Sequence, residues 1–125
     1  LHGDKRLVMG NHDCHSFDLY VRHFQRLFGA HYWKLCILTH IPVHPSNLGD
    51  RFVLNVHGHL HSKHIQIAAD GLYSINTLQG EMIVRAAFAD KYIDDENYFN
   101  VSVERHNLRP VHSSVIMERL EEIGE

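Results

Sequence analysis

Three polar side chains able to bind a metal ion follow apolar runs of the sequence, at points where strands are expected to end. These are Asn11, His40 and His59, and His61 follows two residues after the last of them. Strand ends carry ligands and chemistry in α/β folds. Imidazole nitrogen and amide oxygen together suit a divalent transition metal. The pattern therefore indicates a metal site assembled from residues that are far apart in the sequence.

Each of these residues taken singly also has an ordinary structural interpretation. An asparagine after a glycine, as in Gly10-Asn11, often makes only a turn. A histidine at the end of a buried strand, such as His40, often only bonds nearby backbone. Most other histidines are expected to be solvated, and these are His2, His15, His23, His31, His44, His106 and His112.

The elements expected around these residues alternate between strands and helices. Hydrophobic periodicity predicts strands over residues 6–10, 35–39, 52–56 and 98–104. It also predicts an amphipathic helix over 18–28, stopped by Gly29, and a closing helix over 115–121. Residues 41–50 are expected to form an irregular loop, and residues 63–68 and 72–76 a hairpin.

The composition is that of one folded domain over residues 1–125, with 44% hydrophobic and 22% charged residues. The net charge is -3 and no long run of like charges occurs, so nucleic-acid binding is not indicated. No apolar run approaches the roughly 20 residues of a membrane span, and no membrane partner is expected. With only Cys14 and Cys36, the chain is expected to hold reduced thiols and to be cytoplasmic.

Three motifs occur in one order. Gly10, Asn11, His12 and Asp13 spell Gly-Asn-His-Asp, Thr39 precedes a single His40, and residues 58–61 spell Gly-His-Leu-His. The sequence thereby resembles the calcineurin-like metallophosphoesterases, and residues 98–111 look like the end of small bacterial and bacteriophage members. The fold that this resemblance implies is α/β: an α/β/β/α sandwich with mixed β-sheets and outer helices.

The resemblance also implies a role for each matched residue. Asn11, His40 and His59 would bind one metal ion, and His61 would bind a second. His12 would lie beside the substrate and either protonate the leaving alkoxide or stabilise the phosphate, and Asp13 would orient it. The complete family site holds two divalent transition-metal ions, Mn, Fe, Zn or Ni, and this chain is expected to bind one or two. Two ions about 3.5–4 Å apart clamp phosphoryl oxygens and activate water for in-line attack.

Two motifs of the family are missing from the sequence. An Asp-x-His and a Gly-Asp would precede the residues matched here, and Gly3-Asp4 lies too close to Gly10 to be the second of them. The chain is therefore expected to be an N-terminally truncated phosphoesterase domain without the leading βαβ strands. His57 and His64 match no ligand position, and we expect them beside the site or on the surface.

The function expected from the resemblance is metal-dependent hydrolysis of phosphomonoesters or phosphodiesters, by a dinuclear site that is incomplete in this chain. The expected substrate is a small phosphate ester or a nucleotide. The alternative is a binding or assembly module that keeps the fold without turnover. Losing the leading strands would expose a sheet edge, so self-association into a homo-oligomer is also expected.

Overall fold

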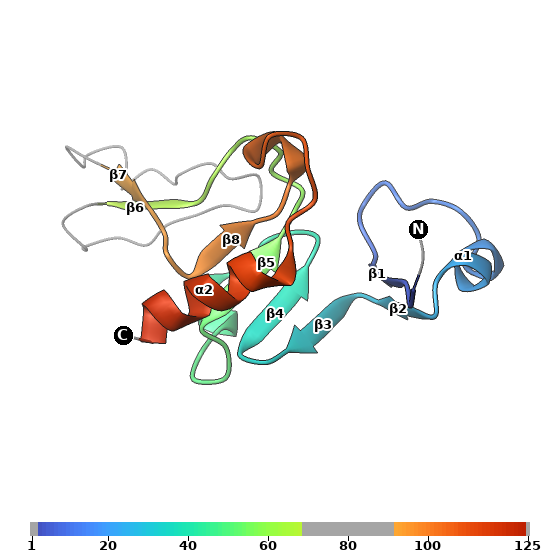
Figure 1. The fold of residues 1–125 in the computed structure, drawn as a ribbon, viewed down its shortest axis with the longest axis horizontal. Coiled ribbons are helices and arrows are strands. Elements are labelled where there is room, and N and C mark those ends of the chain that lie inside the picture. The colour runs from blue at the N-terminus through green and yellow to red at the C-terminus, as the bar shows by residue number, and fades with distance from the viewer. Residues whose placement is uncertain (1–2, 69–91, 125) are drawn as a thin grey trace.

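A four-stranded sheet forms the centre of the molecule in a computed structural model that describes residues 3–68 and 92–124 (Figure 1). Its strand order is β3-β4-β5-β8. β4 (Cys36–Thr39), β5 (Leu54–His57) and β8 (Tyr98–Asn100) run parallel, and β3 (Ala30–Trp33) is antiparallel at one edge. With two α-helices in the described residues, the fold is mixed α/β, as predicted.

The helix α2 (Ser113–Gly124) covers one face of this sheet. Side chains alternate between the two faces of a strand, and Leu54 and Val56 of β5 pack with Phe99 and with Ile116 of α2. Cys36, a free thiol with no exposed surface, belongs to the same cluster. The closing helix predicted over residues 115–121 is therefore confirmed, and it extends two residues further at its start and three at its end. No helix among the described residues has the length and apolar character of a membrane span.

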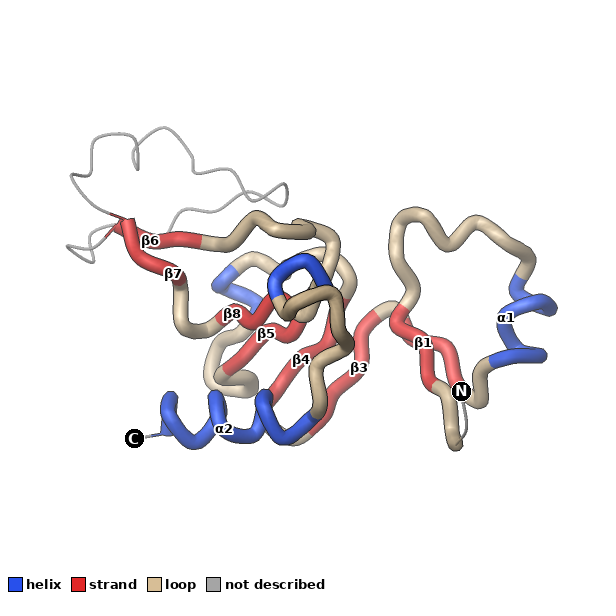
Figure 2. The backbone as a smooth tube through the Cα atoms, turned by 45° about the horizontal axis from the view of Figure 1, so that its top comes forward, coloured by secondary structure: helices blue, strands red, loops and turns tan. Residues whose placement is uncertain are grey.

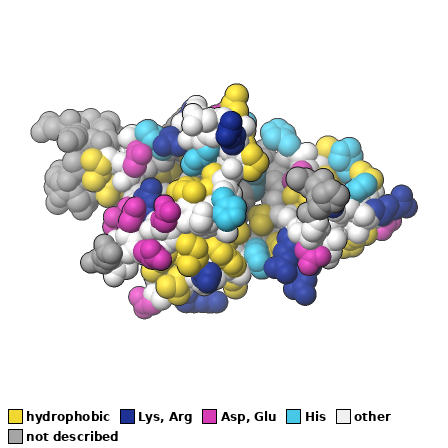
Figure 3. All heavy atoms as spheres, viewed as in Figure 1, with side chains coloured by type: hydrophobic (Ala, Val, Ile, Leu, Met, Phe, Trp, Pro, Cys, Tyr) yellow, Lys and Arg dark blue, Asp and Glu magenta, His cyan; other side chains and the backbone are white. Residues whose placement is uncertain are grey.

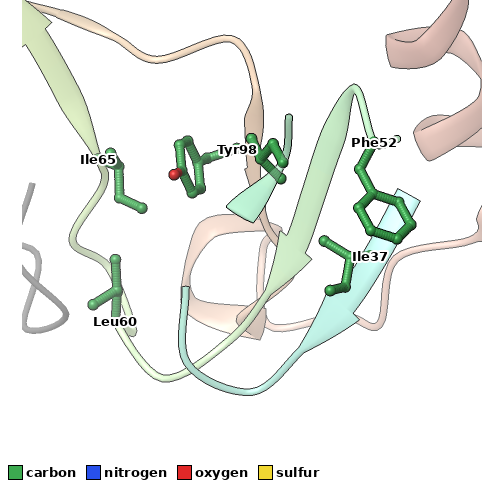
Figure 4. Packing of buried hydrophobic residues seen from close by; sticks show 6 residues of the cluster. Ile37, Phe52, Leu60, Ile65 and Tyr98 are labelled. Atoms are coloured by element: carbon green, nitrogen blue, oxygen red, sulfur yellow. The ribbon is translucent and has the colours of Figure 1, made fainter. Parts of the chain in front are cut away.

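A second apolar cluster covers the opposite face of the sheet (Figure 4). It joins Ile37 of β4 and Tyr98 of β8 to side chains from the loops. Leu60 and Ile65 reach it from the segment after β5, where Figure 4 shows them on the side of Tyr98. Both faces of the sheet are thus covered, and all four residues of β5 are buried, including the polar Asn55 and His57.

A smaller unit, here the N-terminal unit, comprises β1 (Arg6–Val8), α1 (Phe17–His23) and β2 (Arg26–Phe28). β1 and β2 pair in parallel, and Gly29 alone separates β2 from β3. Figures 1 and 2 show the unit beside the four-stranded sheet. The prediction of one helix over residues 18–28 is wrong beyond His23. Leu27 and Phe28 pair with Leu7 and Val8 of β1, which lie 20 positions earlier in the sequence. The local spacing of apolar residues gives no information about such a partner.

Other local predictions also change in the structure. The strand predicted over residues 98–104 stops at Asn100 and is followed by a 3-10 turn, η3 (Val103–Arg105). The loop predicted over 41–50 is confirmed, with a short 3-10 turn, η1 (Pro45–Asn47). β6 (Gln66–Ala68) pairs antiparallel with β7 (Tyr92–Asp94). The other half of the hairpin predicted for β6, residues 72–76, lies outside the described residues.

Candidate metal centre

The ends of β4 and β5 carry two of the predicted ligands to one edge of the sheet. His40 follows β4, and His59 follows β5 after a single residue, Gly58. The strands are parallel neighbours, so the segments that leave them lie side by side. The backbone N–H of Gly58 donates to the carbonyl of His40 at 3.0 Å. This hydrogen bond fixes the spacing of the two histidine-bearing segments.

Asn11, which comes from the loop after β1 in the N-terminal unit, meets these two histidines. Its Oδ1 lies 2.7 Å from Nε2 of His40 and 3.3 Å from Nδ1 of His59. The two imidazole nitrogens lie 3.3 Å from each other. We call Asn11, His40 and His59 the triad. These residues are 19 to 48 positions apart, so only the tertiary fold brings them together.

The donor atoms of the triad suit one transition-metal ion. Ligand atoms that share such an ion at about 2.0–2.2 Å lie roughly 3 Å from each other. The three separations in the triad, 2.7, 3.3 and 3.3 Å, fit this requirement. Two imidazoles and an amide also form a neutral donor set that suits Mn, Fe, Zn or Ni. The residues present therefore fit the ion that the sequence predicts.

Close approach of the backbone at Gly10 leaves room for the ring of His40. A Cβ atom at Gly10 would lie only 2.9 Å from Nδ1 of His40 and 3.0 Å from its Cγ. Burial lowers the pKa of His40, and the nearby His59 lowers it further. Both effects favour the neutral imidazole, which is the form that binds metals.

The loop after β5 turns both His59 and His61 toward the pocket by burying the residue between them. Leu60 is only 4% exposed and belongs to the cluster shown in Figure 4. His59 and His61 both adopt left-handed backbone conformations, with φ of 65° and 55°. Non-glycine residues seldom do so, and such strain is retained where surrounding contacts fix it. The apolar residue in Gly-His-Leu-His is thus an anchor for the loop.

The loop after His40 is held by two buried side chains of the neighbouring strands. Asn55 of β5 has no exposed surface, and its Oδ1 accepts from the backbone N–H of Val43 at 2.9 Å. The hydroxyl of Tyr98 donates to the carbonyl of Val43 at 2.7 Å. The backbone N–H and the carbonyl of Val43, in the loop, are therefore both hydrogen-bonded to side chains of the sheet. This leaves His40 at the base of a fixed loop.

His12 and the triad line one open pocket of about 310 Å³, together with Gly58, His61, Ser102 and Glu104. His12 is exposed there, where it can reach a bound molecule. Asp13 does not line the pocket, and its carboxylate accepts the backbone N–H of Gly10 at 2.6 Å. Asp13 thus closes the turn that carries Asn11 and His12. Its predicted role of orienting His12 stays a prediction.

His61 lies in the same pocket but has a different partner from the triad. Its Nδ1 is 3.0 Å from Oε1 of Glu104, a residue of η3. The sequence analysis did not single out Glu104, because it belongs to none of the matched motifs and lies 43 positions from His61. The one signal in the sequence is a carboxylate soon after the end of the strand that follows the histidine cluster.

The histidines that match no motif have structural surroundings of their own. His57 is 1% exposed and donates from Nδ1 to the carbonyl of Gly58 at 2.9 Å, and burial lowers its pKa to about 4. His64 contacts Asp94 at 2.9 Å, and His106 bonds the carbonyl of Asn100. Histidine side chains also spread over the face shown in Figure 3. Abundance alone therefore does not mark the site.

Comparison with known proteins adds no family assignment: no family model, curated protein or solved structure matches the chain. Within residues 3–68 and 92–124, no group of three or more His, Cys, Asp or Glu side chains is arranged to hold a metal ion. The triad falls outside that definition because its third donor is the amide oxygen of Asn11. The case for the site therefore rests on its geometry and on the sequence motifs.

Proposed function

We propose that this chain is a metal-dependent phosphoesterase with the α/β/β/α sandwich of the calcineurin-like metallophosphoesterases, hydrolysing phosphomonoesters or phosphodiesters. The observation that carries the proposal is the triad. Three residues from three different motifs place their donor atoms within 2.7–3.3 Å of each other. Side-chain hydrogen bonds join these atoms in the absence of an ion, but the roles of Asn11 as a turn residue and of His40 as a backbone partner do not require the three motif residues to meet at one point.

The residues of the pocket divide the work of hydrolysis. Asn11, His40 and His59 would hold one divalent ion, and His61 would bind a second one. Such ions, when bound, polarise phosphoryl oxygens and lower the pKa of water. His12 lies on the same pocket and gives its ring proton to the oxygen of the leaving alcohol. Gly10 leaves room for the ring of His40, and the buried Leu60 anchors the loop that carries His59 and His61.

The test is turnover of p-nitrophenyl phosphate and bis(p-nitrophenyl) phosphate by chelator-treated protein resupplied with Mn²⁺. Asn11→Ala, His40→Ala and His59→Ala should each lower kcat/KM by at least about 100-fold, since even outer partners of metal ligands cost 10–100-fold. His23→Ala is the matched control, because His23 is exposed on α1 and should leave turnover unchanged. Equal activity in all four variants would refute the proposal.

A specific observation favours a second candidate, a metal-binding module without turnover. The triad contains no carboxylate, so it does not neutralise the charge of a bound ion. In that case the wild-type chain binds Mn²⁺ or Zn²⁺ through the triad and hydrolyses neither ester. The same variants then lose metal without any change in turnover, which separates the two candidates.

A further inference from the structure

We propose that Glu104 is a positioning residue for His61: its carboxylate accepts the Nδ1–H proton, so that the imidazole presents the lone pair of Nε2 to the pocket. The inference rests on the proposed function, in which His61 is a ligand of the second metal ion. Neither the motifs nor the comparisons assign any role to Glu104.

Oε1 of Glu104 lies 3.0 Å from Nδ1 of His61, a normal distance for an N–H···O hydrogen bond. Both residues line the pocket that also contains the triad. The hydrogen bond from His61 lowers the pKa of Glu104, which keeps that carboxylate ionised and able to accept.

The backbone around His61 is held by Asn100, the last residue of β8, and by Arg105 of η3. Asn100, only 9% exposed, donates from Nδ2 to the carbonyls of His61 and Lys63, each at 2.9 Å. Its own Oδ1 accepts the backbone N–H of Ser102 at 2.9 Å. Arg105 donates from Nη1 to the carbonyl of Ser62 at 3.1 Å. Glu104 therefore meets His61 across two segments that are tied to each other.

The chemical consequence concerns which nitrogen of His61 carries the proton. A neutral imidazole has one protonated nitrogen and one lone pair, and a hydrogen bond at the first fixes the position of the second. Metal-binding histidines usually donate their other N–H to a carboxylate or a carbonyl, which sets the tautomer and the ring orientation. In the triad, by contrast, Nδ1 of His59 itself faces the other donors. The two histidines of Gly-His-Leu-His thus use different nitrogens.

The experiment reads the tautomer of His61 by long-range ¹H–¹⁵N correlation spectra of the metal-free protein, with His61 in its neutral form. We expect an Nδ1–H signal for His61 in the wild type and in Glu104→Gln, whose amide oxygen can still accept. Glu104→Ala should convert His61 mainly to the Nε2–H form. Glu121→Ala, which removes an exposed carboxylate from α2, should match the wild type. An unchanged tautomer in Glu104→Ala would overturn the inference.

A Zn²⁺ titration of the same samples decides between positioning and direct ligation. Zn²⁺ binding at the His61 site is recognised by the change it causes in the NMR signal of His61 Nε2. A positioning role predicts that Glu104→Ala lowers the Zn²⁺ affinity of this site 10–100-fold and that Glu104→Gln lowers it less. Equal large losses in both variants, with the tautomer of Glu104→Gln intact, would make Glu104 a ligand and overturn the positioning role. The tautomer is measured without metal or substrate. Absence of turnover would therefore contradict the proposed phosphoesterase activity, while the tautomer result would still test the role of Glu104.

Discussion

The four-stranded sheet with α2 and the N-terminal unit differ sharply in how much they bury. Cys36 and Leu54 of the sheet have no exposed surface, and clusters cover both sheet faces. Among residues 6–28, all of which the structure describes, Tyr20 is the only buried side chain. Phe17 and Val21 of α1 are 68% and 46% exposed. Stability is therefore expected to reside in the sheet, with the N-terminal unit opening first.

The triad spans these two regions. His40 and His59 belong to the sheet, and Asn11 belongs to the N-terminal unit. A pocket of about 290 Å³ is lined by Met9, Asn11 and Gly29 and by residues 39–41, so side chains do not fill the space where the two regions meet. The contacts between Asn11 and the two histidines are thus among the few that connect the regions. An ion bound there would join the less buried unit to the sheet.

The largest difference is expected from substituting leucines in the two regions. Leu54→Ala should lower the free energy of unfolding by roughly 2–5 kcal/mol, because it opens a cavity in the cluster under α2. Leu19→Ala is the control, since Leu19 on α1 is 37% exposed and its loss should cost well under that. Urea unfolding followed by circular dichroism measures both. Equal effects would remove the distinction between the regions.

The second effect is acid sensitivity of the sheet through His57. Its pKa in the folded protein is about 4, against about 6.5 in an unfolded chain. As pH falls from 6.5 toward 4, the unfolded state gains a proton that the folded state does not. The contribution of neutral His57 to the free energy of unfolding is therefore fully present above pH 6.5. It is lost as pH falls through this window, by up to about 3 kcal/mol. Between pH 8 and pH 5.5, the wild type should lose about 1.4 kcal/mol more than His57→Gln in urea unfolding. Parallel pH profiles would contradict this origin.

The third prediction concerns the joint between the regions. Zn²⁺ at about 100 times its Kd stabilises the bound form by about 2.7 kcal/mol. Amides of β1 and β2, and that of Met9, which follows β1 and donates its N–H to the carbonyl of Phe28, should then exchange with solvent up to about 100-fold more slowly. Asn11→Ala should abolish this protection, and Asn47→Ala, in the exposed turn η1, should keep it. Protection confined to the sheet would show that the ion does not connect the two regions.

The last effect is steric. Gly10→Ala places a methyl group 2.9 Å from His40 Nδ1, so the ring must move and Zn²⁺ affinity should fall about tenfold, or about 1.4 kcal/mol. At Gly29 an added Cβ meets nothing within 4 Å, which makes Gly29→Ala the matched control. Calorimetric titration of both variants gives the comparison. Unchanged affinity in Gly10→Ala would mean that the position of the His40 ring does not limit binding.

The sequence predicts the parts of this arrangement that depend on short-range patterns. The apolar runs before Asn11, His40 and His59 are strands or strand ends, and the motifs indicate which side chains meet. Contacts between distant segments that no motif marks were not predicted. The end of the predicted helix over residues 18–28 became β2 because it pairs with β1, and β3 was not predicted at all. Glu104 was missed for the same reason, since its partner lies 43 positions away.

The central claim, that the triad binds the ion, is tested most directly by metal content per chain. Wild-type protein, His59→Ala and His23→Ala are loaded with Mn²⁺ or Zn²⁺, freed of excess ion and assayed by elemental analysis. We expect at least one ion per chain in the wild type and in His23→Ala, and loss of an ion in His59→Ala. Equal metal content in all three proteins, or none in the wild type, would contradict the claim.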